Sequence, residues 1–402
     1  MKNWSSARFA MVLSALSAFV LWAAYISTAN CAENDRSRAS DAERWVTLPY
    51  MITKADRDRL FASPPITTEP GFTASILVPP GQLYDPFDLH ILDHNTMLVA
   101  DDGADGHIWK VTTRGHVESL AAPARYAPYT LDLAPPSFGK FRGQIYALAF
   151  NEPNAAGGWE LPDAIVRIDP ATGRETLVCY LPENTSHEKG AGGFFVRFGP
   201  ENSPFGGKLW ITTASNHSIY QVTPDDACKF FETIDLEKWG SPRGITFTAD
   251  GKTMLLGSVT PSPANRAKTV EGGGRILRMR SSGSFEEKPF ASGLTEPGAM
   301  AFAPNGFGHF GGELFVAEVG KWDNDIGITQ EPNKGPFAPV RSDGAVYRIT
   351  SDGKLKRVAS GLRNPVGLAF VGDTLVVTDI NGDFHEGYQK YPDGFMVSII
   401  AP

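Results

Sequence analysis

The chain has 402 residues, with 37 Lys and Arg against 45 Asp and Glu, and a formal net charge of −8. This acidic balance argues against nucleic acid or an anionic membrane surface as a partner, because both require a basic footprint. The 41 glycines and 30 prolines lie along the whole length between short apolar runs, so the composition indicates an all-β protein with many turns.

The first 32 residues have the pattern of a signal peptide. Lys2 and Arg8 precede an apolar run over residues 9–26, and the small residues Ala29 and Ala32 follow. Cleavage is favoured over a retained anchor because the run is barely long enough to span a bilayer. A lipidated Cys31 is a further alternative, although Asn30 is bulky for such a site. We therefore expect a periplasmic or secreted protein with no stable membrane span after cleavage.

Two further features are an N-terminal extension and a pair of cysteines. Residues 33–70 form an N-terminal extension in which residues 51–63 are typical of one short helix. Cys179 and Cys228 remain after cleavage in an oxidising compartment. They form either a disulfide or two buried free thiols, because the sequence does not give the Cα separation that a disulfide needs.

A recurrent phrase predicts the fold. The phrase consists of a Pro or Gly, two further residues, an apolar–x–apolar triplet, a turn and then an apolar strand. The six copies begin at Pro86, Pro128, Gly193, Pro242, Pro297 and Pro365. Each copy continues with further strands, and four antiparallel strands per unit are typical of one blade of a β-propeller. An irregular β-sandwich is the alternative.

The sixth copy has only three strands before the C-terminus. The unclaimed segment of about residues 71–79 has the length and alternation of the missing edge strand. We therefore predict a six-bladed β-propeller over residues 71–402, whose last blade is closed by this N-terminal strand. Closure of this kind removes exposed sheet edges.

Two sets of equivalent positions, one residue from each blade, fall on one face of the predicted propeller; we call each set a column. The residue before each copy is Asp85, Ala127, Gly192, Ser241, Glu296 or Asn364, and the second strands end at Asp101, Ala149, Thr213, Ser258, Glu318 and Asp379. The acids belong to blades five, six and one, which are neighbours once the ring closes. Clustered carboxylates favour a hard cation such as Ca²⁺. The candidate metal ligands are Asp85, Asp101, Glu296, Glu318 and Asp379, and hydrogen bonding of these acids to turn backbones is the alternative.

Long predicted loops on the same face supply the other candidates. His187 and His385 are the candidate catalytic bases. The candidate cofactor-binding residues are Arg243, Lys321, Trp322, Arg341, Arg363 and Asn364. A Gly-rich phosphate loop, HExxH, CxxC and GxSxG motifs are absent from the sequence, which argues against nucleotide, zinc protease and serine hydrolase chemistry.

The phrase SGLRNPVGLAF from Ser360 and the FGGKLWIT and FGGELFVAE turns resemble the glucose/sorbosone dehydrogenase group of propellers. The resemblance covers roughly residues 71–402 and implies sugar oxidation with pyrroloquinoline quinone (PQQ) and calcium. Arg363 and Asn364 match the Arg-Asn pair of that family. Ala191 occupies the place of its catalytic histidine, with His187 four positions earlier.

The acidic residues also resemble the cation site of gluconolactonase- and paraoxonase-type calcium propellers, with Glu296, Asn364 and Asp379 as the best matches. The favoured expectation is a quinone-dependent sugar or alcohol dehydrogenase acting on a small polar molecule. A calcium-dependent lactonase or esterase is the first alternative. A non-catalytic carbohydrate-binding or scaffold propeller is the second.

Overall fold

The computed structural model describes residues 61–101, 106–121, 126–150, 163–181, 193–214, 216–262, 269–320, 343–380 and 392–402. The chain divides into two compact units, residues 1–53 and 54–402, and all described residues belong to the second unit. The predicted signal peptide and nearly all of the predicted helix at 51–63 therefore lie outside the described residues.

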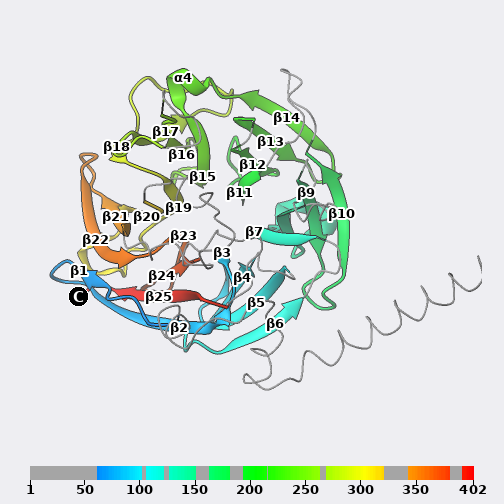
Figure 1. The fold of residues 1–402 in the computed structure, drawn as a ribbon. Coiled ribbons are helices and arrows are strands. Elements are labelled where there is room, and N and C mark those ends of the chain that lie inside the picture. Colours follow the sequence, from blue (N-terminus) through cyan, green and yellow to red (C-terminus); the bar gives the residue numbers. More distant parts are fainter. Residues whose placement is uncertain are drawn as a thin grey trace, which may run out of the picture. The chain divides into compact units, whose positions relative to one another are not determined.

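Six antiparallel sheets surround a centre and form a six-bladed β-propeller, as the repeats predicted (Figure 1). Blade 1 consists of β3 (Pro86–Asp93), β4 (Thr96–Asp101), β5 (His107–Thr112) and β6 (Val117–Ala121). Blade 2 consists of β7 (Ala127–Leu133), β8 (Ile145–Phe150), β9 (Ala164–Ile168) and β10 (Glu175–Tyr180). Blade 3 consists of β11 (Gly193–Phe198), β12 (Leu209–Thr213), β13 (Ser218–Val222) and β14 (Cys228–Thr233).

Blade 4 consists of β15 (Ser241–Phe247), β16 (Met254–Val259), β17 (Gly274–Met279) and β18 (Ala291–Leu294). Blade 5 consists of β19 (Pro297–Phe302), β20 (Leu314–Glu318), β21 (Gly344–Ile349) and β22 (Leu355–Leu362). Blade 6 consists of β23 (Pro365–Val371), β24 (Thr374–Asp379), β25 (Gly394–Ile400) and β2 (Thr73–Leu83). The short helix α4 (Leu236–Trp239) joins blades 3 and 4, and the 3₁₀ helices η2 (Pro136–Phe141) and η3 (Gly308–Phe310) lie in the first turns of blades 2 and 5.

The N-terminal strand closes the ring. β2 pairs with β25 in antiparallel register, with Thr73 opposite Ile400 and Ser75 opposite Ser398. This confirms the predicted closing strand, which extends to Leu83 rather than ending near residue 79. An additional strand, β1 (Thr67–Thr68), was not predicted and pairs with β22 of blade 5. The segment before the repeats therefore ties blades 5 and 6 together.

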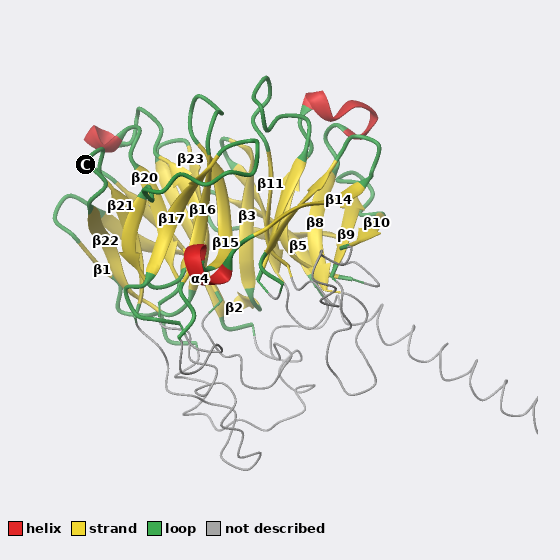
Figure 2. Cartoon of the chain, turned by 90° about the horizontal axis from the view of Figure 1, so that it is seen from above, coloured by secondary structure: helices red, strands yellow, loops and turns green. Residues whose placement is uncertain are grey.

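The strands run between two faces of the disc (Figure 2). In each blade the innermost strand begins, and the second strand ends, on the same face, which we call the mouth face. α4 lies on the mouth face, and the turns that contain η2 and η3 lie on the other face. None of the helices in the described part of the chain is long and apolar enough to cross a membrane.

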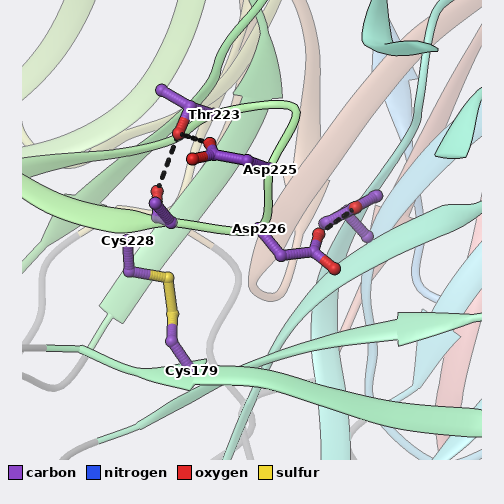
Figure 3. Close-up of a disulfide and its surroundings, with 7 residues drawn as sticks. Cys179, Thr223, Asp225, Asp226 and Cys228 are labelled. Atoms are coloured by element: carbon purple, nitrogen blue, oxygen red, sulfur yellow. Dashed lines mark hydrogen bonds between the residues drawn. A yellow bond between two sulfur atoms is a disulfide. The ribbon is translucent and has the colours of Figure 1, made fainter. Parts of the chain in front are cut away.

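A disulfide links Cys179 of β10 to Cys228 of β14 (Figure 3). Their Cα atoms are 6.3 Å apart, within the range that a disulfide bridges. The bond joins the outer strands of blades 2 and 3, where the two blades diverge most. Of the two outcomes left open by the sequence, the structure contains the disulfide.

Candidate functional site

Neighbouring inner strands bring four residues together at the mouth of the central channel. Close approach is possible because of two glycines: a Cβ on Gly298 would lie 2.7 Å from Val366 O, and one on Gly367 would lie 2.9 Å from Phe87 O. These approaches align β19 with β23 and β23 with β3. The residues at or just before the strand starts therefore follow one another around the mouth, and they are Ser241, Glu296, Asn364 and Asp85.

The acids that end the second strands of blades 5, 6 and 1 bind the backbone. Glu318 accepts the N–H groups of Thr295 (3.0 Å) and Glu296 (2.7 Å). Asp379 accepts those of Arg363 (2.8 Å) and Asn364 (2.9 Å) in blade 6. Asp101 accepts those of Tyr84 (2.9 Å) and Asp85 (2.7 Å) in blade 1. These three carboxylates, which we call the clamp acids, thus fix the two residues before each inner strand.

The clamp geometry is the backbone alternative that the sequence left open for Asp101, Glu318 and Asp379. The second strands of blades 2, 3 and 4 end in residues without a carboxylate, so this clamp is confined to blades 5, 6 and 1. Burial, with the charge of Glu296 as a smaller cause, raises the pKa of Glu318 to about 7.

Glu296 and Asn364 have buried polar atoms that nothing in the described chain satisfies. Glu296 is 3% exposed, and its Oε1 accepts the Nε–H of Arg243 at 2.8 Å. Its Oε2 has no hydrogen-bond partner among the described residues, and neither Oδ1 nor Nδ2 of Asn364 has one there. Asn364 is 1% exposed. Each such atom costs about 1–3 kcal/mol when it is left unsatisfied, so their grouping indicates a place for a ligand.

Arg243 is engaged within the protein. Besides Glu296, it donates from Nη1 to Ser241 Oγ at 2.8 Å and to the carbonyl of Pro242 at 3.1 Å. Its guanidinium lies over the ring of Phe194, 4.8 Å from the ring centre. Arg243 therefore holds Glu296 and Ser241 at the mouth, whereas the sequence suggested that it binds a cofactor.

Arg363 is also engaged elsewhere. Its guanidinium donates from Nη2 to the carbonyl of Ala62 at 3.0 Å, and the side chain is buried. This contact fixes the segment before β1 to the start of blade 6. The remaining candidates for the cofactor and for catalysis, Lys321, Trp322, Arg341, His187 and His385, lie outside the described residues.

Sequence reasoning missed two pairs on the mouth face. His217 Nδ1 lies 3.1 Å from Ser241 Oγ, and Tyr129 donates its hydroxyl to Asp163 Oδ2 at 2.7 Å. Burial raises the pKa of Asp163 to about 7. Both His217 and Asp163 immediately precede the third strand of their blade. A third column at that position would have revealed them beside the two columns that were compared.

Two side-chain pairs join the inner strands of blades 1, 2 and 3 in the middle of the channel. Arg197 donates from Nη1 and Nη2 to the two carboxylate oxygens of Asp88, at 2.6 and 2.7 Å. His90 Nδ1 lies 2.6 Å from Asp132 Oδ1. Burial opposes ionisation of Asp132, but His90 and Arg197 outweigh it and hold the pKa of Asp132 below its ordinary value.

The residues present fit a hard cation better than a quinone. Within the described ranges, no three His, Cys, Asp or Glu side chains gather closely enough to hold a metal ion, so the five predicted acids do not act as one ligand set there. Glu296 Oε2 and Asn364 Oδ1 are nevertheless oxygen ligands of the kind that Ca²⁺ accepts together with water and carbonyl groups. The carboxylates of PQQ need cationic partners, and both described candidates, Arg243 and Arg363, already bind protein oxygens.

No protein-family model matches the chain, and no curated protein matches its sequence. Solved structures do match. A glucose dehydrogenase-type oxidoreductase from Thermus thermophilus has 19% identity and a TM-score of 0.51, over 82% of this chain and 100% of the other. A gluconolactonase from Xanthomonas campestris has 15% identity and a TM-score of 0.52, over 85% and 95%.

The PQQ-bound aldose sugar dehydrogenase from Streptomyces coelicolor has 14% identity and a TM-score of 0.52, over 84% of this chain and 100% of the other. At these identities the likeness concerns the fold alone. It confirms the resemblance inferred from the repeats: this chain shares the propeller fold of glucose dehydrogenase-like, aldose sugar dehydrogenase and gluconolactonase proteins.

Proposed function

We propose that the chain is an exported, cation-dependent hydrolase that opens a lactone or ester of a small polar molecule at the channel mouth. The observation that carries this proposal is the group of buried, unpartnered atoms on Glu296 and Asn364. The disulfide between Cys179 and Cys228 supports export, because such bonds persist in oxidising compartments.

Glu296 Oε2 and Asn364 Oδ1 would hold the cation, and the bound cation would polarise the carbonyl of the substrate. Arg243 keeps Glu296 in place through Oε1, which leaves Oε2 for the ligand. Asn364 Nδ2 remains as a donor for a substrate oxygen. The clamp acids Glu318 and Asp379 fix the backbone on which Glu296 and Asn364 are carried.

This proposal reverses the order that the sequence favoured. Quinone-dependent sugar oxidation requires cationic partners for the carboxylates of the cofactor, and the two described arginines already bind protein oxygens. It is therefore the competing function, and a binding propeller without catalysis is the third.

The test is hydrolysis of a panel of lactones and esters by the purified protein, before and after removal of metal with a chelator. We expect activity to disappear with the chelator and to return with added Ca²⁺ or another divalent cation. Glu296→Gln should weaken cation binding, measured by isothermal titration calorimetry, by about 100-fold, equivalent to about 2.8 kcal/mol. Hydrolysis that is indifferent to the chelator would refute the proposal.

The matched control is Glu313→Gln. Glu313 belongs to the same blade and also pairs with an arginine, Arg348, at 2.7 Å, but it lies at the start of β20 and thus on the face opposite the mouth. It should leave cation binding unchanged. Dye reduction over a sugar panel after addition of PQQ and calcium, in the absence of hydrolysis, would establish the competing function instead.

A further inference from the structure

His217 is held in an unusual position at the channel mouth. It precedes β13 and has a backbone φ of +52°, which residues other than glycine rarely adopt. Strained backbone of this kind is concentrated at functional sites. The His217 side chain is half-buried, and its Nδ1 lies 3.1 Å from Ser241 Oγ.

The contact with Ser241 orients the imidazole of His217. Ser241 is 3% exposed, and its single hydroxyl proton is donated to the carbonyl of Ala214 at 3.2 Å. Its oxygen accepts the Nη1–H of Arg243 at 2.8 Å. Nδ1 is thus the ring nitrogen that faces Ser241, and Nε2 lies on the other side of the imidazole.

The same contacts connect His217 to the proposed cation site. One guanidinium, that of Arg243, binds Ser241 Oγ from Nη1 and Glu296 Oε1 from Nε, each at 2.8 Å. Ser241 and Glu296 also occupy equivalent positions at the starts of β15 and β19, on adjacent blades. The basic group and the unpartnered oxygen of Glu296 are thus fixed to each other through one side chain.

We propose that His217 is the general base of the channel-mouth site, and that Ser241 and Arg243 are its positioning residues; this inference rests on the proposed hydrolysis. His217 Nε2 takes a proton from water as the water oxygen bonds to the carbonyl carbon of the substrate. As the ester C–O bond breaks, Nε2 returns this proton to the departing oxygen. Lactone and water are consumed, a hydroxy acid is formed, and the imidazole is unchanged.

The first experiment compares His217→Asn with the wild type. Asparagine tolerates positive φ, so the backbone of the turn is preserved. We expect kcat to fall by about 10²–10⁴-fold, the range of general acid–base catalysis, while the calorimetric affinity for the cation stays unchanged. His116→Asn is the control, because His116 is exposed in the turn between the third and fourth strands of blade 1, on the opposite face.

The second experiment tests the positioning role of Ser241. Ser241→Ala removes the partner of Nδ1, and we expect kcat to fall by about tenfold with KM nearly constant, since an unfixed base is misoriented. Ser241→Thr retains the hydroxyl and should recover most of this loss. This pair also covers the case in which His217→Asn fails to fold.

The outcomes separate the two proposals. If the wild type hydrolyses substrate and both His217→Asn and Ser241→Ala behave like His116→Asn, His217 is not the base and the cation-dependent function stands. If the wild type neither hydrolyses any substrate nor binds a cation, the proposed function fails and the role of His217 fails with it. Loss of kcat with intact cation binding and recovery in Ser241→Thr would support both.

Discussion

The middle and the mouth of the central channel use the same residue types in opposite ways. In the middle, Arg197 donates to both oxygens of Asp88, so neither carboxylate oxygen is left without a partner. At the mouth, Arg243 binds only one oxygen of Glu296, and the other oxygen has no partner within the described chain. A buried pair that satisfies both carboxylate oxygens holds the blades together, whereas one that leaves an oxygen unpaired retains the capacity to bind something else.

The same contrast appears within the mouth. The clamp acids Glu318 and Asp379 accept backbone N–H groups, and the residues that they fix, Glu296 and Asn364, present unpartnered atoms. Blades 5 and 6 thus each combine a satisfied acid, which determines position, with a group that has no partner among the described residues. Positioning and the proposed ligand binding thus belong to different residues of the same blade.

Breaking the mid-channel pair should have the largest effect on stability. Asp88→Ala leaves the Arg197 guanidinium buried without its carboxylate, and we expect the free energy of unfolding to fall by about 3–5 kcal/mol. Urea denaturation measures this change. Glu313→Ala, which breaks the more exposed pair with Arg348, is the comparison and should cost about 1 kcal/mol. Equal losses would show that the mid-channel pair has no special structural role.

Separate substitutions of Asp379 and Asn364 in blade 6 test the contrast at the mouth. Asp379→Ala leaves the N–H groups of Arg363 and Asn364 without their acceptor, so the free energy of unfolding should fall by about 2–4 kcal/mol. Asn364→Leu replaces unpartnered polar atoms with apolar ones of similar volume, so in the absence of cation it should change stability by about 0–1 kcal/mol, in the stabilising direction.

Thermal unfolding with chelator present checks both variants, and cation titration separates them further. Asn364→Leu should abolish the stabilisation that added cation gives to the wild type, because that stabilisation requires binding to the folded state. A strong loss of stability in Asn364→Leu would mean that the amide has structural partners, and the ligand site would then be refuted.

The fold could be predicted because the same sequence repeat is recognisable six times along the chain. The start of each inner strand, from Pro86 to Pro365, falls within one residue of the predicted position, and β2 supplies the missing edge strand. Period-two alternation and a recurrent Pro or Gly are local signals, so they need no knowledge of side-chain contacts. β1 was not foreseen because a two-residue strand carries no periodic signal.

The site was only partly predictable, for a physical reason. The columns placed Glu296, Asn364 and Asp379 on one face, but sequence does not tell which carboxylate meets a backbone N–H and which is left unpaired. Asp379 and Glu296 look alike in the sequence and differ in the structure by their hydrogen-bond partners. His217 was missed because its importance depends on Ser241, a residue of the next blade.

The last prediction concerns Asp163, whose carboxyl resembles that of Glu296. Asp163 is 1% exposed, its Oδ2 accepts from Tyr129 and Gly193, and its Oδ1 has no partner among the described residues. We expect a proton rather than a cation on this oxygen. The pKa of Asp163, raised by burial to about 7, agrees with this difference.

Because the folded state binds this proton more tightly than the unfolded chain, the resulting stability is complete below about pH 4 and is lost as the pH rises to about 7. Between about pH 5.5 and 7.5 the wild type should lose about 2 kcal/mol more than Asp163→Asn, whose neutral amide has the same shape as the protonated carboxyl. Glu318 titrates in both proteins and cancels in the difference. Urea denaturation at the two pH values gives the result, and parallel losses in the two proteins would show that folding does not raise the pKa of Asp163.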